Sequence, residues 1–451
     1  MKKRIIISWL NSLLFIFDAY SADPTDLTVL DTFKTYNKIR SEKYNNIEDI
    51  EKEKRFPIAL KLDSLDHLLQ QQGKSIIQSA LETKNGEFST FKSIDTLLKA
   101  SISPHIVVTD VEKMDGGFVS GEIYRIETIQ TDTNTTESYF LKYLRKTFVL
   151  VSSGRCYGEK VNLSFLMNNP RIQEIQNHIT IILPELIAEY TDASGEKKDF
   201  IILPGARGKS FSRIVKDIGK GQNVDPANNA FKALGSSLAQ MHHTHRRFAT
   251  PPQDESLITK KDFINAYVLS HTDLHGDNVF YCQTTQQIYF IDAESMAYSF
   301  DENGNPNSPI AYDLLYMLLM SSRKFGDFMP KNGWEPFKYF LKGYTDTYPS
   351  NERLGIYDYL DEALVSAKKV GFKDLFRHFS WEKTMALPEL AGAEKLTTYI
   401  RELRLNFKKE QMTHTSDEAK EKIEQYYIAL KAKQQKTGNI PHKKRPVEYK
   451  C

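Results

Sequence analysis

The sequence predicts an α+β protein in which a strand-rich lobe is followed by a larger, mostly helical lobe. Short β-type runs dominate residues 106–203, and helical periodicity dominates the chain after residue 227. Between the two regions lies the breaker Pro204-Gly205-Ala206-Arg207-Gly208, which marks a lobe boundary. With 451 residues, of which 40% are hydrophobic, the chain is long enough for two lobes and an extension.

The chain divides into five predicted segments. We expect a signal peptide at residues 1–22, a helical amino-terminal extension at residues 23–105 and a basic tail at residues 436–451. Between them, residues 106–204 form the strand-rich lobe and residues 205–435 the helical lobe. The extension has apolar residues at helical spacing but no group with recognisable chemistry, which favours a structural cap or a partner-docking surface.

The first residues resemble a secretory signal. Lys2-Lys3-Arg4 precedes an apolar segment from Ile5 to Phe17, and the small residues Ala19 and Ser21 follow it. The apolar segment is short for a bilayer span, and an uncleaved anchor or a buried amphipathic helix is the alternative. We therefore expect a secreted or extracytoplasmic protein, or a cytoplasmic one if the segment is not a signal. No later stretch is long and apolar enough to cross a membrane.

Charge and cysteine content argue against several classes of function. The chain has 60 basic and 58 acidic residues, a formal charge of +2, which gives no general basis for binding nucleic acid. Its three cysteines, Cys156, Cys282 and Cys451, are far apart and odd in number. This pattern indicates neither a disulfide framework nor a zinc site.

One lysine lies inside an otherwise apolar strand, at residues 139–144. Burying Lys142 there is costly unless an anion meets it, so the lysine requires a carboxylate or a phosphate. Glu159, near the start of the helix predicted next, is the preferred partner, and Glu174 and Glu185 are alternatives.

A glycine-rich loop at residues 116–121 precedes this strand. Because glycine has no Cβ, Gly117 and Gly121 would let backbone amides approach a phosphate. A hairpin turn or bulge explains the same glycines equally well.

The densest polar stretch runs from His271 to Asn278 and is followed by a strand that ends at Asp292 and Glu294. A His-x-Asp with Asn five residues after the Asp matches the catalytic-loop spacing of kinases, here with Asp273. Phosphoryl transfer needs a carboxylate to orient the attacking hydroxyl, and an amide and another carboxylate to hold Mg²⁺. The alternative is a polar turn that joins two strands.

The helix predicted over residues 227–245 ends in histidines. His242 and His245 could share one helical face, as metal ligands do, but no matching ligand cluster occurs elsewhere. Histidines that face the carboxy-terminal helix dipole are the favoured interpretation.

After Asp313 the periodicity predicts further helices over residues 334–344, 355–370, 375–390, 394–405 and 416–433. Aromatic residues in this region could line a pocket for a cationic or ring-bearing acceptor, although most are expected to be core. They are Trp334, Tyr339, Tyr344, Tyr357, Phe379 and Trp381.

Four segments in order resemble the aminoglycoside phosphotransferase and choline kinase superfamily, from about Ile106 to the Tyr344 region. They are residues 234–242, His271-x-Asp273-Leu274-His275-x-x-Asn278, Ile291-Asp292-x-Glu294, and residues 309–315 with Asp313. The resemblance implies a two-lobed protein kinase-like fold, with a small antiparallel-sheet N-lobe and a larger, mostly helical C-lobe.

The resemblance also implies roles. Asp273 would be the catalytic base, while Asn278 and Asp292 would hold Mg²⁺ with Glu294 near the metal or substrate. His271 would brace the loop, and Asp313 would tie the next helix to the loop backbone. His275 would form hydrogen bonds within the loop or contact the transferred phosphate. Lys142, paired with Glu159, would bind the ATP phosphates, and backbone groups of Leu203 to Ala206 would bind the adenine.

Three residues depart from the family pattern. Asp277 stands where glycine is usual, Gly276 stands where proline is common, and Thr272 is a mild change. The extra carboxylate could alter metal affinity or loop geometry.

The implied function is Mg-ATP-dependent transfer of the γ-phosphate to a hydroxyl of a small molecule that is aminoglycoside-, choline- or sugar-like. The alternatives are a secreted kinase-like effector that transfers phosphate or a nucleotide to a protein, an inactive relative, and a non-catalytic binding module. Export is harder to reconcile with an ATP-dependent small-molecule phosphotransferase, because extracytoplasmic spaces of bacteria hold little ATP.

Overall fold

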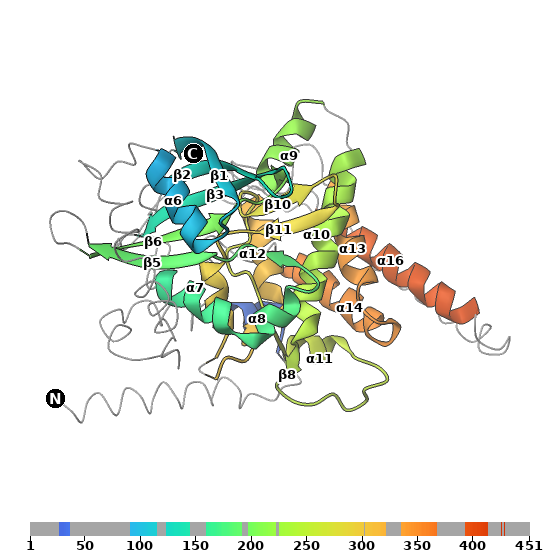
Figure 1. Ribbon diagram of the computed structural model, residues 1–451. Coiled ribbons are helices and arrows are strands. Elements are labelled where there is room, and N and C mark those ends of the chain that lie inside the picture. Colours follow the sequence, from blue (N-terminus) through green and yellow to red (C-terminus); the bar gives the residue numbers. More distant parts are fainter. Residues whose placement is uncertain are drawn as a thin grey trace, which may run out of the picture.

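The computed structural model describes residues 27–36, 91–114, 123–144, 159–191, 197–221, 225–301, 303–321, 335–367 and 393–413, together with residues 425 and 428. These residues form a mixed α+β structure in which a largely antiparallel strand-rich part adjoins a helical part (Figure 1). The predicted α+β class is confirmed.

The largest sheet has five antiparallel strands in the order β1-β2-β3-β6-β5. Its strands are β1 (Ile106–Met114), β2 (Ile123–Gln130), β3 (Thr135–Leu144), β5 (Leu186–Thr191) and β6 (Lys197–Pro204). Helix α6 (Phe91–Ser101) covers one face, where its apolar residues pack on Ile126 and Leu141. The lysine-bearing strand β3 is therefore the central strand of this sheet.

The opposite face of the sheet meets helix α7 (Glu159–Asn168), which is followed by α8 (Pro170–Ile175). Leu163 of α7 packs on Ile201 of β6, and Ile201 lies directly across from Lys142 of β3. Because residues paired across two strands share a face, Lys142 points toward α7.

Two smaller sheets follow. One has the order β4-β11-β10-β7 and contains the hairpin β10–β11, and the other has the order β12-β9-β8. Their strands are β4 (Thr180–Ile181), β7 (Lys209–Ser210), β8 (Arg247–Phe248), β9 (Ala266–Val268), β10 (Val279–Cys282), β11 (Gln287–Phe290) and β12 (Ser308–Pro309).

The helical part contains the largest core cluster of buried apolar residues. Its helices are α9 (Phe211–Gly219), α10 (Asp225–Thr244), α11 (Lys260–Ile264), the 3₁₀ helix η1 (Ala293–Ser299), α12 (Ala311–Ser321), α13 (Glu335–Asp346), α14 (Ser350–Ala367) and α16 (Ala393–Thr413). In Figure 1, α16 projects from this part at its outer edge.

Helices α10 and α13 approach closely because each has a glycine at the contact. A Cβ on Gly235 would lie 2.0 Å from the Phe340 carbonyl oxygen, and one on Gly343 would lie 2.1 Å from that of Lys232. The hydroxyl of Ser236 donates to the Gly343 carbonyl across the same contact. This packing holds α10, which leads toward the polar loop at residues 271–278, against the helical core.

The described parts of the predicted extension have different neighbours. Helix α6 packs on the five-stranded sheet. The helix at residues 29–36, by contrast, inserts Val29, Phe33 and Tyr36 into the core of the helical part. The Tyr36 hydroxyl donates to the Tyr298 carbonyl oxygen, and the Val29 amide donates to Glu362. This helix is therefore an integral part of the fold.

Several predicted segments lie outside the described residues. They are the signal segment 1–22, the glycine-rich loop with Gly117 and Gly121, the helix at residues 375–390 and the basic tail. Within the described part of the chain, no helix combines the length and the apolar composition that crossing a membrane requires.

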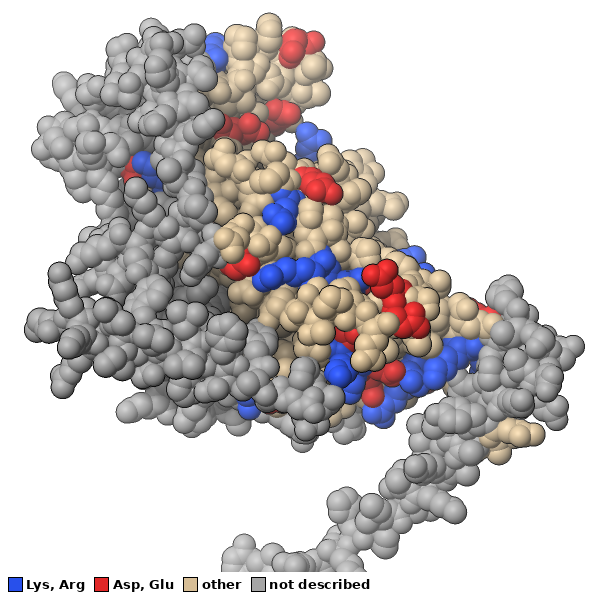
Figure 2. All heavy atoms as spheres, turned by 90° about the horizontal axis from the view of Figure 1, so that it is seen from below, with Lys and Arg blue, Asp and Glu red and all other residues tan. Residues whose placement is uncertain are grey.

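The surface charges are mixed. On the face drawn in Figure 2, Lys and Arg side chains lie beside Asp and Glu side chains. Ion pairs such as Arg401 with Asp361 join the surfaces of α14 and α16. This mixture agrees with the near balance of charges in the sequence.

Candidate active site

Lys142 lies at the junction between the five-stranded sheet and the hairpin β10–β11. Its Nζ atom is 2.6 Å from Oε1 of Glu159 on α7 and 3.7 Å from Oδ1 of Asp292, which follows β11. The lysine side chain is 8% exposed, whereas that of Asp292 is 43% exposed. The lysine is thus enclosed by the protein, and the Asp292 carboxylate faces open space.

Three carboxylates surround this one cation. Burial would lower the pKa of Lys142, but the charges of Glu159, Asp292 and Glu294 outweigh burial and raise it. Burial and the neighbouring Asp292 raise the pKa of Glu294 to about 8 despite the opposing charge of Lys142. The site therefore carries more negative than positive charge, and it would gain electrostatic stability from an added cation.

The hairpin places Asn278 beside Asp292. Val279 pairs with Phe290 in the β10–β11 register, and the Ile291 amide donates to the Asn278 carbonyl oxygen. Asn278 and Asp292 consequently lie at the same end of the hairpin. The Asn278 amide nitrogen donates to the backbone and side chain of Asp273, so its Oδ1 atom is the one that could ligate a cation.

Asp273 is 2% exposed and held by hydrogen bonds at both carboxylate oxygens. Oδ2 accepts from the Asn278 amide at 3.0 Å, and Oδ1 accepts from the Tyr316 hydroxyl at 2.6 Å. Nε2 of His275 lies 3.6 Å from Oδ2. These contacts orient the Asp273 carboxylate at both of its oxygens.

The backbone at Thr272, just before Asp273, and at Asp292 has an uncommon conformation. Thr272 has φ 63° and Asp292 has φ 52°, both in the left-handed region. For a β-branched residue such as Thr272 this conformation costs about 1–2 kcal/mol. The Thr272 hydroxyl donates to the Ser295 carbonyl oxygen, and the Ser295 hydroxyl donates to the His271 carbonyl oxygen. Helix η1 therefore helps to hold the loop in this shape.

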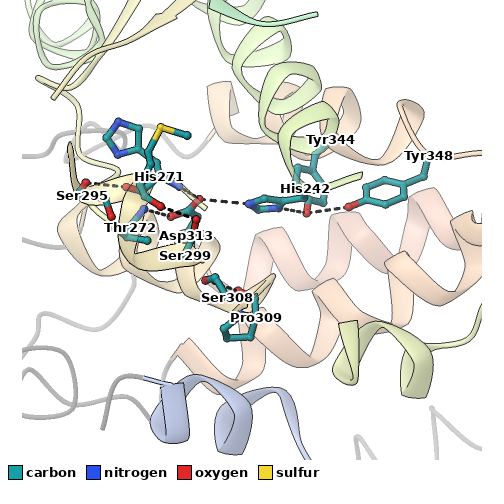
Figure 3. Close-up of polar contacts among 11 residues, drawn as sticks. His242, His271, Thr272, Ser295, Ser299, Ser308, Pro309, Asp313, Tyr344 and Tyr348 are labelled. Carbon is teal, nitrogen blue, oxygen red and sulfur yellow. Dashed lines mark hydrogen bonds and ion pairs between the residues drawn. The ribbon is translucent and has the colours of Figure 1, made fainter. Parts of the chain in front are cut away.

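Asp313 of α12 lies beneath the loop (Figure 3). Its carboxylate accepts the backbone N–H groups of His271 at 2.7 Å and Thr272 at 2.9 Å, so α12 is tied to the loop backbone. The His271 side chain donates through Nε2 to the Ile291 carbonyl oxygen at 2.9 Å. This bond links the start of the loop to the residue before Asp292.

His242 joins the same buried network (Figure 3). Its Nε2 atom is 3.3 Å from Asp313, its Nδ1 atom is 2.7 Å from the Tyr344 hydroxyl, and Tyr344 in turn contacts Tyr348. We expected His242 at a helix end facing the dipole, but its side chain is fully buried among α12 and α13. His245 bonds to the Arg171 carbonyl oxygen, so the two histidines have separate partners.

The connection at residues 205–208 crosses from the five-stranded sheet to the hairpin sheet. Leu203, near the end of β6, and Ala206 are partly buried, and the Gly205 amide donates to the Ser138 carbonyl oxygen at 2.7 Å. Gly208 has φ 95°, and a Cβ there would lie 2.0 Å from the Tyr281 carbonyl oxygen, so the turn requires glycine. The predicted adenine position thus lies at the crossing between the sheets.

Other candidates are placed differently. Of the carboxylates considered for Lys142, Glu159 makes the contact, while Glu174 lies beside His245. Asp277 is exposed. Among the aromatic candidates, Tyr344 and Tyr357 are core and Tyr339 is 41% exposed. Trp334, Phe379 and Trp381 lie outside the described residues.

Tyr316 is the residue at this site that sequence reasoning missed. It lies three residues after Asp313 on α12, so the two side chains share one face of the helix. That spacing was a usable signal, but the surrounding apolar residues of α12 made Tyr316 resemble a core aromatic.

The oxygen-rich site fits Mg²⁺, the metal that the family resemblance implies. Among the described residues, no three His, Cys, Asp or Glu side chains form a complete metal cage. Mg²⁺ in phosphoryl-transfer sites uses one or two carboxylates and completes its shell with phosphates and water, so it needs no such cage. Asn278, Asp292 and Glu294 supply hard oxygen donors, and the surplus of negative charge around Lys142 favours a cation.

No protein-family model and no curated protein matches this sequence. Among solved structures, one similar chain is WaaP in complex with acyl carrier protein, with 12% sequence identity and a TM-score of 0.32. The likeness covers 57% of this chain and 88% of that chain. A similarity this distant decides neither the family nor the activity.

Proposed function

We propose that the protein is a Mg-ATP-dependent phosphotransferase with a two-lobed kinase-like fold. The observation that carries the proposal is the position of Lys142, enclosed by the sheet, bonded to Glu159 and 3.7 Å from Asp292. A buried lysine between a helix carboxylate and a carboxylate at the end of a hairpin is the arrangement that holds nucleotide phosphates in kinases.

In this proposal each side chain has one task. Lys142 binds the α and β phosphates of ATP, and Glu159 fixes the lysine in place. Asn278, Asp292 and Glu294 would hold Mg²⁺, which when bound neutralises charge on the phosphates. Backbone groups from Leu203 to Ala206 receive the adenine ring, at the crossing between the two sheets.

Asp273 acts on the acceptor. It orients the acceptor hydroxyl and takes its proton as the new P–O bond forms, while the bond between the γ-phosphorus and the ADP oxygen breaks. The hydrogen bonds from Asn278 and Tyr316 preset the carboxylate for this task. His271 and Asp313 hold the loop backbone in place. Nε2 of His275 lies near Oδ2 of Asp273.

The acceptor we propose is a hydroxyl-bearing small molecule of the aminoglycoside, choline or sugar type. The support is the resemblance of the motifs from His271 to Asp313 to enzymes with such acceptors. A protein acceptor is the alternative, and both belong in the same screen.

The test combines nucleotide binding with turnover. We expect a fluorescent ATP analogue to bind only with Mg²⁺, and ATP consumption to rise with a hydroxyl acceptor from a panel that includes proteins. Asp273→Asn should abolish turnover and preserve binding, whereas Asp361→Asn, which alters a partly exposed carboxylate on α14, should preserve both. Equal activity of the wild type and Asp273→Asn would contradict the proposal.

A further inference from the structure

The Tyr316 hydroxyl forms the shortest of the hydrogen bonds described above to the Asp273 side chain. Its oxygen lies 2.6 Å from Oδ1, and both residues are almost fully buried, at 5% and 2% exposure. Asn278 contacts the other oxygen. A carboxylate bonded at only one oxygen can rotate about its χ2 torsion, whereas donors at both oxygens limit that rotation.

Helix α12 contacts the loop twice, through residues on the same face. Asp313 accepts the backbone N–H groups of His271 and Thr272. Tyr316, one helical turn later, donates to the Asp273 side chain. The backbone of the loop and the side chain that it presents are therefore positioned by one rigid element.

The ring of Tyr316 is itself fixed by aromatic neighbours. It stacks on Tyr312 with ring centres 6.0 Å apart and planes inclined by 25°. Tyr312 in turn stacks on Phe33 at 5.7 Å and meets the edge of Tyr36 at 4.9 Å. Phe33 and Tyr36 belong to the helix at residues 29–36. Such rigid packing lets the phenol present its hydroxyl with little loss of conformational entropy.

We propose that Tyr316 is a positioning residue that holds the Asp273 carboxylate in the orientation needed to receive the acceptor proton. The proposal rests on the phosphotransferase function proposed above. Tyr316 exchanges no proton with the substrate and acts only through Asp273. Its removal should therefore slow turnover without weakening nucleotide binding.

The first experiment compares Tyr316→Phe with wild type in Mg²⁺-dependent ATP hydrolysis, in which water replaces the acceptor. We expect kcat to fall about tenfold, the loss that corresponds to one hydrogen bond to a charged group, with KM for ATP changed less than about twofold. Tyr357→Phe is the matched control, since it removes a buried phenol hydroxyl on α14, where the ring packs on Phe407. It should leave both constants unchanged.

The second experiment tests the coupling through stability. The free energies of unfolding of Tyr316→Phe and Asp273→Asn should fail to add in the double variant, because the two side chains share one contact.

The outcomes separate the two proposals. An unchanged kcat in Tyr316→Phe, in an enzyme that Asp273→Asn inactivates, would overturn the positioning role alone. If the wild type has no Mg²⁺-dependent turnover, the proposed function fails, and the catalytic role of Tyr316 fails with it. Whatever the activity, additive unfolding energies would overturn the contact between Tyr316 and Asp273 on which the positioning role depends.

Discussion

His242 and Asp313 meet in the protein interior, with Nε2 of the imidazole 3.3 Å from Oδ2 of the carboxylate and neither side chain exposed to solvent. The same carboxylate accepts the N–H groups of His271 and Thr272. Three donors from two segments thus converge on Asp313. This convergence makes the residue a junction between α10, α12 and the loop.

Asp313→Asn should destabilise the protein by about 3 kcal/mol, because an amide has one acceptor oxygen and leaves buried donors unpaired. Denaturant unfolding monitored by circular dichroism measures the change. Asp361→Asn is the control, since Asp361 pairs with Arg401 at the partly exposed surface of α14. Its cost should stay below about 1 kcal/mol. Equal costs at the two positions would contradict the role of Asp313.

Lys142→Met should weaken Mg-ATP binding at least about tenfold, because the phosphates lose their buried cation. Titration with a fluorescent nucleotide measures the affinity. Lys160→Met is the control. Lys160 lies on the same helix as Glu159, but its Nζ atom pairs with Asp199 at 2.8 Å. It should bind nucleotide like the wild type. If both variants bind equally well, Lys142 is structural.

Gly235→Ala should destabilise the protein by about 2 kcal/mol or more, because the new Cβ would meet the Phe340 carbonyl oxygen at 2.0 Å. The thermal unfolding midpoint reports the effect. Gly219→Ala, at the end of α9, is the control, because a Cβ on Gly219 would meet no atom within 4 Å. Alanine should leave stability there unchanged or slightly higher. A neutral Gly235→Ala would refute the close approach of α10 and α13.

Glu352 should make stability depend on pH in the acid range. Burial would raise its pKa, but hydrogen bonds from His243 and Arg246 outweigh burial and lower it from 4.5 to about 2. Arg246 contacts both carboxylate oxygens, at 2.6 and 2.7 Å. A depressed pKa means that this stabilisation is present above pH 4.5 and is lost as the pH falls toward 2.

The contribution at stake is about 2 kcal/mol after allowance for solvent screening. Denaturant unfolding of wild type and Glu352→Gln, followed from neutral to acid pH, measures it. Glu352→Gln should be less stable at neutral pH, and the difference should shrink as the pH falls. A difference that stays constant with pH would show that the ion pair does not supply it.

Export should leave a mature chain that begins at Asp23, if residues 1–22 act as a cleaved signal. Mass spectrometry of protein from expressing cells and from their medium locates the amino terminus. A retained Met1 in both samples would contradict cleavage.

Local patterns predicted the elements that hold most of the candidate residues. The isolated lysine in an apolar strand indicated an anionic partner, and the structure places Glu159 2.6 Å away. The spacing from Asp273 to Asn278 brought those side chains together because the loop is short. Asp292 follows them because the turn between β10 and β11 fixes the register of the hairpin.

Contacts between distant segments were not predictable in this way. His242 lies in the last turn of α10, where histidine usually faces solvent, and only the packing of α12 and α13 buries it. The left-handed φ of Thr272 was likewise not predictable from the sequence, because a β-branched residue rarely adopts that conformation. Tertiary hydrogen bonds from that residue to Ser295 and Asp313 impose it.

The helix at residues 29–36 also has a consequence for synthesis. The Val29 amide bonds to Glu362, 333 residues further along the chain. At about 5–20 residues per second, roughly 20–70 s separate the synthesis of these two residues. During that interval the core cluster that Phe33 joins, which extends to Phe407, is not yet fully synthesised. The first helix of the described chain is therefore among the last to dock, and the apolar face that it exposes meanwhile is a natural target for chaperones.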